Sequence, residues 1–238
     1  MALAESYILS IAVSLGAGCL TLAACTPAPK PYPHEGHFTL VQIEDVPDLP
    51  RVLLIGDSIS MWYTLGVRQR LEGRANVHRP HRNCRSTQQT LAELEGYLGR
   101  GQWDVIHFNC GIHDLTHLNE SGEPLPPPMG KPQVPLEQYR KNLRLLLDRL
   151  ERTGARLIWA STTPVGPGAQ YRFNSDVIAY NGVAAELMRD RGVWINDLYA
   201  VVEPRAGELL ADGVHLTPGG SEILADAVAT TIAQQLSR

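Results

Sequence analysis

The sequence predicts an α/β fold in a single domain, a three-layer sandwich with a parallel β-sheet between two layers of helices. From residue 51 to the C-terminus, short apolar runs typical of buried parallel strands alternate with segments of helical periodicity. No internal repeat and no second domain interrupts this alternation. A sheet of this kind places active sites at the carboxyl ends of its strands, so polar residues directly after the apolar runs are the first candidates.

The first half of the domain is expected to contain two strands, one helix and one long loop. Residues 52–55 and residues 103–109 are apolar runs, and a glycine follows each of them. Residues 61–71 have the composition of a helix. Residues 123–135 are so rich in proline that no regular element is expected there. This loop is either a surface excursion or a rim beside the site.

The second half continues with helix, strand, helix and strand at residues 136–150, 157–160, 176–189 and 193–195. The first of these helices has leucines at helical spacing and is closed by Gly154. A last helix is expected to begin at Thr217-Pro218, with threonine as the N-cap and proline in the first turn.

The first 24 residues are expected to be a signal peptide that lies outside this domain. They are largely apolar and end in the sequence Leu-Ala-Ala before Cys25, which resembles a bacterial lipobox with Cys25 as the lipidated residue. Glu5 and the lack of Lys or Arg before the apolar stretch depart from this pattern. A misassigned start or an uncleaved anchor would explain that departure, and a buried N-terminal helix is the other alternative.

The segment 25–50 is expected to be a proline-rich tether, and the domain is expected to span 51–238. The protein would then be a lipoprotein of the bacterial cell envelope, in the periplasm or at the outer membrane, or a secreted protein. Its contact with a membrane would be only through the lipid on Cys25. Cys84 and Cys110 would remain in the mature chain, either as a disulfide or as small buried thiols.

Composition excludes two classes of protein. Hydrophobic residues make up 44% of the 238 residues, which is enough to bury a core and excludes disorder for most of the chain. The 21 Lys and Arg are balanced by 25 Asp and Glu, and no basic stripe is present, so no nucleic-acid partner is expected. No cofactor and no metal are expected either. The H-x-x-H pairs at His34/His37 and His78/His81 lack further ligands in a rigid frame.

Three polar residues have the chemistry of a nucleophilic hydrolase. Ser58 follows the first apolar run, and Asp212 and His215 lie in the loop before the last helix. Serine needs a base to take its proton, and the imidazole of His215 is the candidate. A carboxylate three residues earlier, in a loop that contains Gly213, would hold that ring in one tautomer. Ser58 at the start of a helix would also place its own N–H where an oxyanion forms.

These residues resemble the SGNH (GDSL) hydrolases over residues 51–238. The Gly-Asp-Ser sequence that ends at Ser58 matches the block that carries the nucleophile. Asp212 and His215 match the Asp-x-x-His block that supplies the acid and the base. The resemblance implies a flavodoxin-like SGNH fold and the catalytic set Ser58, Asp212 and His215. The half-match to G-x-S-x-G and the short acid–base spacing disfavour an α/β-hydrolase.

The two middle blocks depart from the family pattern. Residues 83–87 lack the usual glycine, so the resemblance implies that Arg85, or else Ser86, supplies its backbone N–H to the oxyanion hole. The charge of Arg85 would meet an anionic substrate, unless Arg85 is a solvated loop residue. The third block is Gly-x-His-Asp, with His113 in place of asparagine. His113 is therefore either the side-chain oxyanion donor, together with the N–H of Ser58, or a structural histidine near Asp114.

The resemblance implies a serine esterase that forms a covalent acyl-enzyme. Short-chain or carbohydrate O-acetyl esters are the favoured substrates, and the partner is thus a small-molecule or carbohydrate ester. A lysophospholipase or thioesterase of the same fold is an alternative. A non-catalytic glycan- or lipid-binding protein is the alternative from another class, because the middle blocks are altered. An intact set of Ser58, Asp212 and His215 favours the enzyme.

Overall fold

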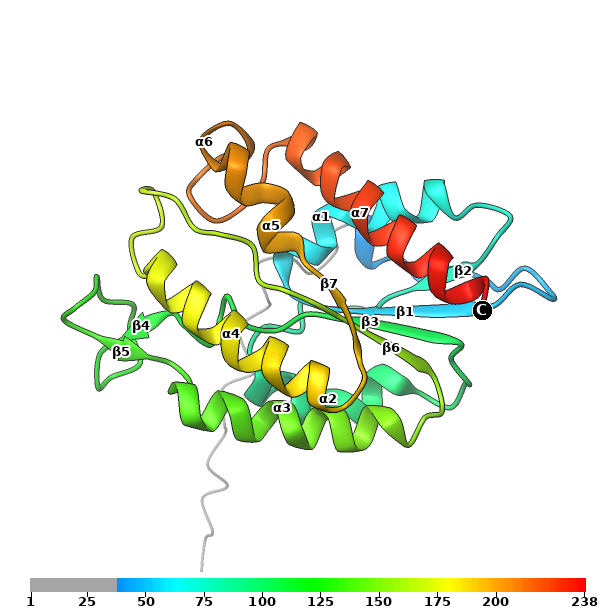
Figure 1. Ribbon diagram of the computed structural model, residues 1–238, viewed down its shortest axis with the longest axis horizontal. Coiled ribbons are helices and arrows are strands. Elements are labelled where there is room, and N and C mark those ends of the chain that lie inside the picture. Colours follow the sequence, from blue (N-terminus) through cyan, green and yellow to red (C-terminus); the bar gives the residue numbers. More distant parts are fainter. Residues whose placement is uncertain (1–37) are drawn as a thin grey trace, which may run out of the picture. The chain divides into compact units, whose positions relative to one another are not determined.

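A computed structural model describes residues 38–238, and they form the predicted three-layer α/β domain (Figure 1). Its central sheet has five parallel strands in the order β2-β1-β3-β6-β7. The strands are β1 (Arg51–Ile55), β2 (Asn76–His78), β3 (Val105–Phe108), β6 (Arg156–Ala160) and β7 (Trp194–Asn196). The strand order reverses at β1, which pairs with β2 on one side and β3 on the other. A ligand crevice is expected at the carboxyl ends of strands at such a reversal.

Helices cover both faces of this sheet (Figure 1). The first layer contains α1 (Ser58–Arg70), α5 (Leu198–Val202) and α7 (Pro218–Leu236), and the second contains α2 (Thr87–Leu98), α3 (Leu136–Glu151) and α4 (Asn174–Asp190). The short elements are η1 (Phe38–Leu40), η2 (Glu203–Arg205) and α6 (Ala206–Leu209). The strands β1 and β3 are buried almost completely, because helices pack against both of their faces.

Most expected elements are present, and the last helix has the expected cap. Thr217 precedes α7, its side chain accepts a hydrogen bond from the N–H of Gly220, and Pro218 is the first helical residue. The helix α1 begins at Ser58 rather than at Met61, because the carboxylate of Asp57 accepts a hydrogen bond from the N–H of Ile59 and caps the helix there. The chain therefore passes directly from strand to helix at the candidate nucleophile.

Two elements between residues 76 and 98 were not predicted. The strand β2 has only three residues, and α2 mixes glutamines and threonines with few apolar residues, so neither has a clear period. The proline-rich segment 123–135 is mostly loop, as expected, but it includes β5 (Lys131–Pro132). This strand pairs antiparallel with β4 (His117–Leu118) in a small hairpin. Two residues are enough for this pairing, and the N–H that Pro132 lacks is not needed there.

The segment before β1 is described only from residue 38. The expected signal peptide at residues 1–24, the lipidation residue Cys25 and most of the tether lie outside the described residues. The described end of the tether contacts the domain, since Asn76 exchanges hydrogen bonds with the backbone of Val46. Asp45 forms ion pairs with Arg51 and with His78. Within residues 38–238, no helix has the length and apolar character needed to cross a membrane.

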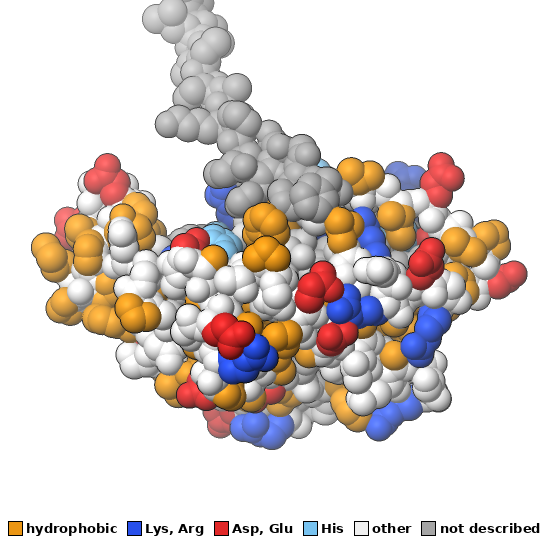
Figure 2. Space-filling model, turned by 90° about the horizontal axis from the view of Figure 1, so that it is seen from above, with side chains coloured by type: hydrophobic (Ala, Val, Ile, Leu, Met, Phe, Trp, Pro, Cys, Tyr) orange, Lys and Arg blue, Asp and Glu red, His pale blue; other side chains and the backbone are white. Residues whose placement is uncertain are grey.

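Charged side chains of both signs are interspersed on the face shown in Figure 2. The described residues on this face form no continuous basic stripe, which agrees with the balanced composition.

Candidate active site

The structure brings Ser58, His215 and Asp212 into one hydrogen-bonded chain. The distance between Ser58 Oγ and His215 Nε2 is 2.9 Å, and the distance between His215 Nδ1 and Asp212 Oδ2 is 2.8 Å. Ser58 is the first residue of α1, directly after the turn that follows β1, and the other two residues come from the loop before α7. This is the geometry in which a carboxylate fixes the histidine tautomer and the histidine accepts the serine proton.

The carboxylate of Asp212 also holds its own loop together. Its Oδ1 accepts hydrogen bonds from the backbone N–H groups of Val214, at 2.9 Å, and His215, at 2.7 Å. Partial burial acts to raise the pKa of Asp212, but the hydrogen bonds from the His215 ring and from the two N–H groups outweigh it and lower the pKa to about 2. Asp212 is therefore an ionised carboxylate at any pH well above 2.

Two glycines allow a second loop to pack against the acid–base loop. Gly213 has φ of +85°, which disfavours a side chain, and its carbonyl accepts a hydrogen bond from the N–H of Gly166 at 2.8 Å. A Cβ atom on Gly168 would lie 2.6 Å from the carbonyl oxygen of Asp212. Because that contact is with backbone, no side-chain rotation can relieve it.

We expect Gly168→Ala to reduce kcat by at least about tenfold, because moving the backbone of Asp212 misaligns His215. Measuring kcat on an activated ester, together with the melting temperature, checks this. Gly182→Ala is the matched control, since a Cβ atom there meets nothing within 4 Å in helix α4. An unchanged kcat in Gly168→Ala would show that this loop contact does not position the triad.

The turn that carries Ser58 is held from beneath by buried charged groups. Asp57 is fully buried, and burial raises its pKa to about 6 in spite of the hydrogen bond from Ile59. Arg79 is also buried and donates hydrogen bonds to the carbonyl of Gly56 and to the hydroxyl of Ser60. These contacts fix the backbone on both sides of Ser58, which stands at the first position of α1. An N–H at that position has no acceptor within the helix.

The two expected oxyanion residues occupy different places. His113 lines the cavity that contains Ser58 and His215. Arg85 is not among the residues that line it, although its φ of +55° suits the glycine that the family pattern has there. The N–H of Arg85 donates to Asn83 Oδ1 at 2.9 Å. For this N–H to bind an oxyanion, the bond to Asn83 would have to be given up.

Residues that the sequence did not single out complete the cavity, which has a volume of about 360 Å³. Asn83 and residues 168–172 line it together with the triad. The loop that contains residues 168–172 follows β6, so its place at the carboxyl edge of the sheet could have been inferred from the topology. The direction in which each side chain of this loop points could not have been inferred, because it depends on the loop conformation.

Asp114, next to His113, is buried and serves the structure. Its carboxylate accepts hydrogen bonds from the N–H of Thr87, at 3.0 Å, and from the Thr87 hydroxyl, which in turn accepts from Asn142 at 2.9 Å. Burial raises the pKa of Asp114 to about 7, although the Thr87 hydrogen bonds oppose this shift. The folded protein therefore keeps a proton on Asp114 that the unfolded chain loses above about pH 4.

We expect the free energy of unfolding of Asp114→Asn to rise relative to that of the wild type between pH 4 and pH 7. Ionisation of Asp114 costs the wild type stability in this range, at most on the order of 4 kcal/mol, and the variant has no such group. The quantity to measure, by denaturant titration, is the difference in unfolding free energy between variant and wild type. The wild-type curve alone is not enough, because burial lowers the pKa of His107 to about 3 and His107 therefore makes stability rise with pH in the same range. If the unfolding free energies of the two proteins changed with pH in parallel, the raised pKa of Asp114 would be contradicted.

Among residues 38–238, the other candidate cysteines and histidines do not gather into a second centre. Cys84 and Cys110 are buried free thiols, which selects that alternative over a disulfide. His78 is paired with Asp45, while His34 and His37 lie outside the described residues. Within residues 38–238, no three His, Cys, Asp or Glu side chains cluster as a metal site would require.

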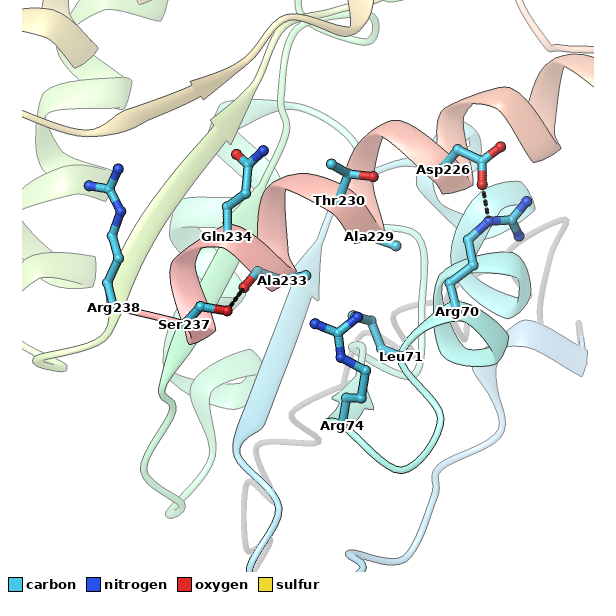
Figure 3. Close-up of a pocket in the computed structure, with 10 residues that line it drawn as sticks. All are labelled: Arg70, Leu71, Arg74, Asp226, Ala229, Thr230, Ala233, Gln234, Ser237 and Arg238. Atoms are coloured by element: carbon cyan, nitrogen blue, oxygen red, sulfur yellow. Dashed lines mark hydrogen bonds and ion pairs between the residues drawn. The ribbon is translucent and has the colours of Figure 1, made fainter.

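A larger groove, of about 590 Å³, lies at the far ends of α1 and α7 (Figure 3). Arg70, which is bonded to Asp226, lines it together with Arg74. Ser58 and His215 lie at the opposite ends of the same helices, roughly 20 Å away along α1. No histidine lines this groove, whereas the smaller cavity holds Ser58 beside His215, so the smaller cavity is the candidate active site.

The fold is similar to that of known proteins. The chain is 24% identical over 197 residues to the human isoamyl acetate-hydrolyzing esterase 1 homolog, which covers 74% of this chain and 78% of the relative. A lipase/acylhydrolase from Enterococcus faecalis has a similar structure, with a TM-score of 0.66 and 17% identity over 79% of this chain and 97% of its own. An acetyl xylan esterase has a TM-score of 0.63 and 16% identity, over 76% of this chain and 99% of its own. The GDSL-like lipase/acylhydrolase family matches residues 54–223, across both ends of the triad, and the chain therefore belongs to this family of ester hydrolases.

Proposed function

We propose that the protein is a serine esterase that acts through a covalent acyl-enzyme on Ser58. The observation that carries the proposal is the unbroken chain from Ser58 Oγ through the His215 ring to Asp212, at 2.9 Å and 2.8 Å, on the wall of a cavity. All groups needed for acyl transfer are supplied by the protein.

In the first half of the reaction, Ser58 Oγ attacks the ester carbonyl carbon while His215 Nε2 takes the hydroxyl proton. The tetrahedral intermediate collapses, the bond to the alcohol oxygen breaks, and Nε2 returns the proton to that oxygen. In the second half, water attacks the acyl-enzyme and gives a proton to Nε2. That proton returns to Ser58 Oγ as the carboxylic acid leaves. The carboxylate of Asp212 stabilises the protonated ring in both halves.

The oxyanion would be bound by the N–H of Ser58, by His113 and by the N–H of Arg85. The position of Ser58 at the start of α1 and the place of His113 in the cavity wall support this proposal. Arg85 contributes only when its N–H leaves Asn83 Oδ1.

We expect His113→Ala to lower kcat on an activated acetyl ester by roughly 10²–10³, the usual effect of losing one oxyanion donor. His113→Asn should retain more activity, because an amide also donates. A kcat for His113→Ala within about threefold of wild type would leave His113 with a structural role only.

Short-chain esters, including carbohydrate O-acetyl esters, are the proposed substrates. A cavity of about 360 Å³ is at the small end of ligand pockets and suits a short acyl group. Two similar proteins have names that refer to acetate esters: one is a homolog of an isoamyl acetate-hydrolyzing esterase, and the other is an acetyl xylan esterase. A signal peptide and a lipid on Cys25 would place the enzyme in the cell envelope, near such polysaccharides, or it would be secreted.

A second candidate is the hydrolysis of lysophospholipids or thioesters with longer acyl chains. One observation favours it: a more apolar hollow of about 670 Å³ borders His215 on the side of Trp62, Leu216 and Pro218. Activity on p-nitrophenyl esters of increasing chain length separates the two. A maximum at acetate supports the short-chain enzyme, and a maximum at eight carbons or more supports the second candidate.

A fluorophosphonate probe tests the proposed chemistry, because it reacts only with an activated serine. We expect the folded wild type to form a covalent adduct and Ser58→Ala to form none. Ser121→Ala, which changes an exposed serine in the β4–β5 hairpin, is the matched control and should label fully. A folded wild type without a Ser58 adduct would favour a non-catalytic binding protein.

A further inference from the structure

The guanidinium group of Arg172 lies at the candidate catalytic cavity, and only one of its nitrogens donates a hydrogen bond to the described part of the protein. It lines the cavity together with Ser58, and its Nε donates a hydrogen bond to the carbonyl of Ile112 at 2.8 Å. Arginine carries five N–H donors, four of them on Nη1 and Nη2. Within residues 38–238, the terminal nitrogens of Arg172 have no hydrogen bond and no ion pair. Because Ile112 directly precedes His113, the bond to its carbonyl fixes this group beside the expected oxyanion donor.

Arg79, which is buried more deeply than the half-buried Arg172, shows the contrast. Arg79 donates to the hydroxyls of Ser60 and Thr64 and to the carbonyls of Gly56, Pro80 and Arg82. An arginine that serves only the fold is thus surrounded by acceptors here, as burial of a charge requires. Arg172 has one acceptor and faces a cavity instead.

The backbone holds Arg172 in place. Its N–H donates to the carbonyl of Ala169 at 3.1 Å, and the carbonyl of Tyr171 accepts from the N–H of His117 at 2.8 Å. A donor held in this way loses little freedom when it binds a ligand, which favours affinity.

The two carboxylates that act electrostatically on Arg172, those of Asp57 and Asp212, do not form ion pairs with it. Asp212 is bonded to His215 and to its own loop, and Asp57 is buried beneath the start of α1. Both carboxylates act to raise the pKa of Arg172, while burial lowers it. Within the described part of the chain neither lies within ion-pair distance of the guanidinium. A positive charge with free donors in a partly closed cavity attracts an anionic group.

We propose that Arg172 binds a carboxylate of the substrate, so that the enzyme selects esters with an anionic group close to the scissile bond. The planar guanidinium can donate two parallel hydrogen bonds to a carboxylate, which a neutral amide of the same shape cannot match. The proposal rests on the proposed esterase function and names the substrate class of the same site. The carboxylate belongs either to the acid or to the alcohol half of the ester.

The experiment compares each anionic ester with a neutral amide of the same shape. Ethyl hydrogen succinate against ethyl succinamate tests a carboxylate on the acid half, and acetoxyacetate against 2-acetoxyacetamide tests one on the alcohol half. Acid release in a pH-stat gives kcat/KM for each. We expect the wild type to prefer the anionic member of one pair by at least about tenfold.

Three variants separate charge recognition from structure. Arg172→Gln should abolish the preference for the anionic ester but should still hydrolyse the ester bond of the neutral, amide-bearing compounds. Arg172→Lys should restore part of the preference through its charge. Arg74→Gln removes an exposed arginine in the remote groove, and it should change neither value (Figure 3). Melting temperatures confirm that the variants fold.

Two results would overturn the proposal. One is a wild type that turns over both members of each pair equally. The other is an Arg172→Gln variant that loses the neutral and anionic esters to the same extent, which would make Arg172 structural or part of the oxyanion hole. Failure of the esterase proposal itself looks different, because the wild type would then hydrolyse no ester and form no Ser58 adduct with the probe.

Discussion

Replacing either Ser58 or His215 with alanine should reduce kcat by roughly 10⁶ on any ester that the wild type hydrolyses. Ser58→Ala removes the atom that forms the acyl-enzyme. His215→Ala removes the base that lies 2.9 Å from that atom. Because the two residues perform one step together, the double variant should be no slower than either single variant.

Steady-state kinetics on p-nitrophenyl acetate measures these values, and the melting temperatures show whether the variants fold. Ser121→Ala and His81→Ala change the same residue types outside the cavity and are the controls. If the kcat loss of the double variant equalled the product of the two single losses, Ser58 and His215 would act independently. That result would contradict a shared proton transfer.

Asp212→Asn should reduce kcat by about 10⁴ while leaving the fold intact. The Oδ1 atom of asparagine can still accept from the N–H groups of Val214 and His215, so the loop should keep its shape. In the variant, an amide NH₂ replaces the oxygen that accepts from His215 Nδ1. Nδ1 then has to accept a hydrogen bond instead of donating one. The ring then carries its hydrogen on Nε2, where it cannot take the proton of Ser58.

Circular dichroism and the kcat of the variant test this prediction. Asp226→Asn is the matched control, because Asp226 is an exposed partner of Arg70 in the remote groove. A kcat for Asp212→Asn within about tenfold of wild type would show that the His215 tautomer is set by another group. The exposed position of Asp212 makes a stability effect secondary, since exposed ion pairs contribute little.

The order of elements could be predicted because most of the segments carry their own periodic pattern. Helix α3 has leucines at helical spacing, and α7 has Thr217 and Pro218 at its start. The same local signals failed for β2 and α2. These two elements form because β2 pairs with β1 and α2 packs against α3, and neither partner is close in sequence. The confirmed fold class therefore rests on the strong elements.

The candidate triad could be predicted because its residue types and spacing carry the chemistry. Asp212 and His215 are three residues apart in one loop, so their contact is largely local. Ser58 is far from them in sequence, and it joins them because β1 ends at the point where the strand order reverses. The predicted parallel sheet places Ser58 at its carboxyl edge, but the reversal at β1 depends on β2, which the sequence did not predict.

The rest of the cavity required the tertiary structure. The sequence predicts Arg85 as the charged residue that meets a substrate. In the structure, Arg172, two residues before α4, lines the cavity and Arg85 does not. Its direction follows from a hydrogen bond to Ile112, a residue that lies 60 positions earlier in the chain.

The sequence by itself thus determines the fold class, the family and the three residues proposed for catalysis, because periodicity, caps and short motifs are local properties. The tertiary structure decides which donors surround the substrate. Those donors project from loops whose shape depends on contacts between distant segments, such as Gly168 against Asp212 and Arg172 against Ile112. A contact of this kind leaves no period in the sequence, since it is fixed only when the loops pack together.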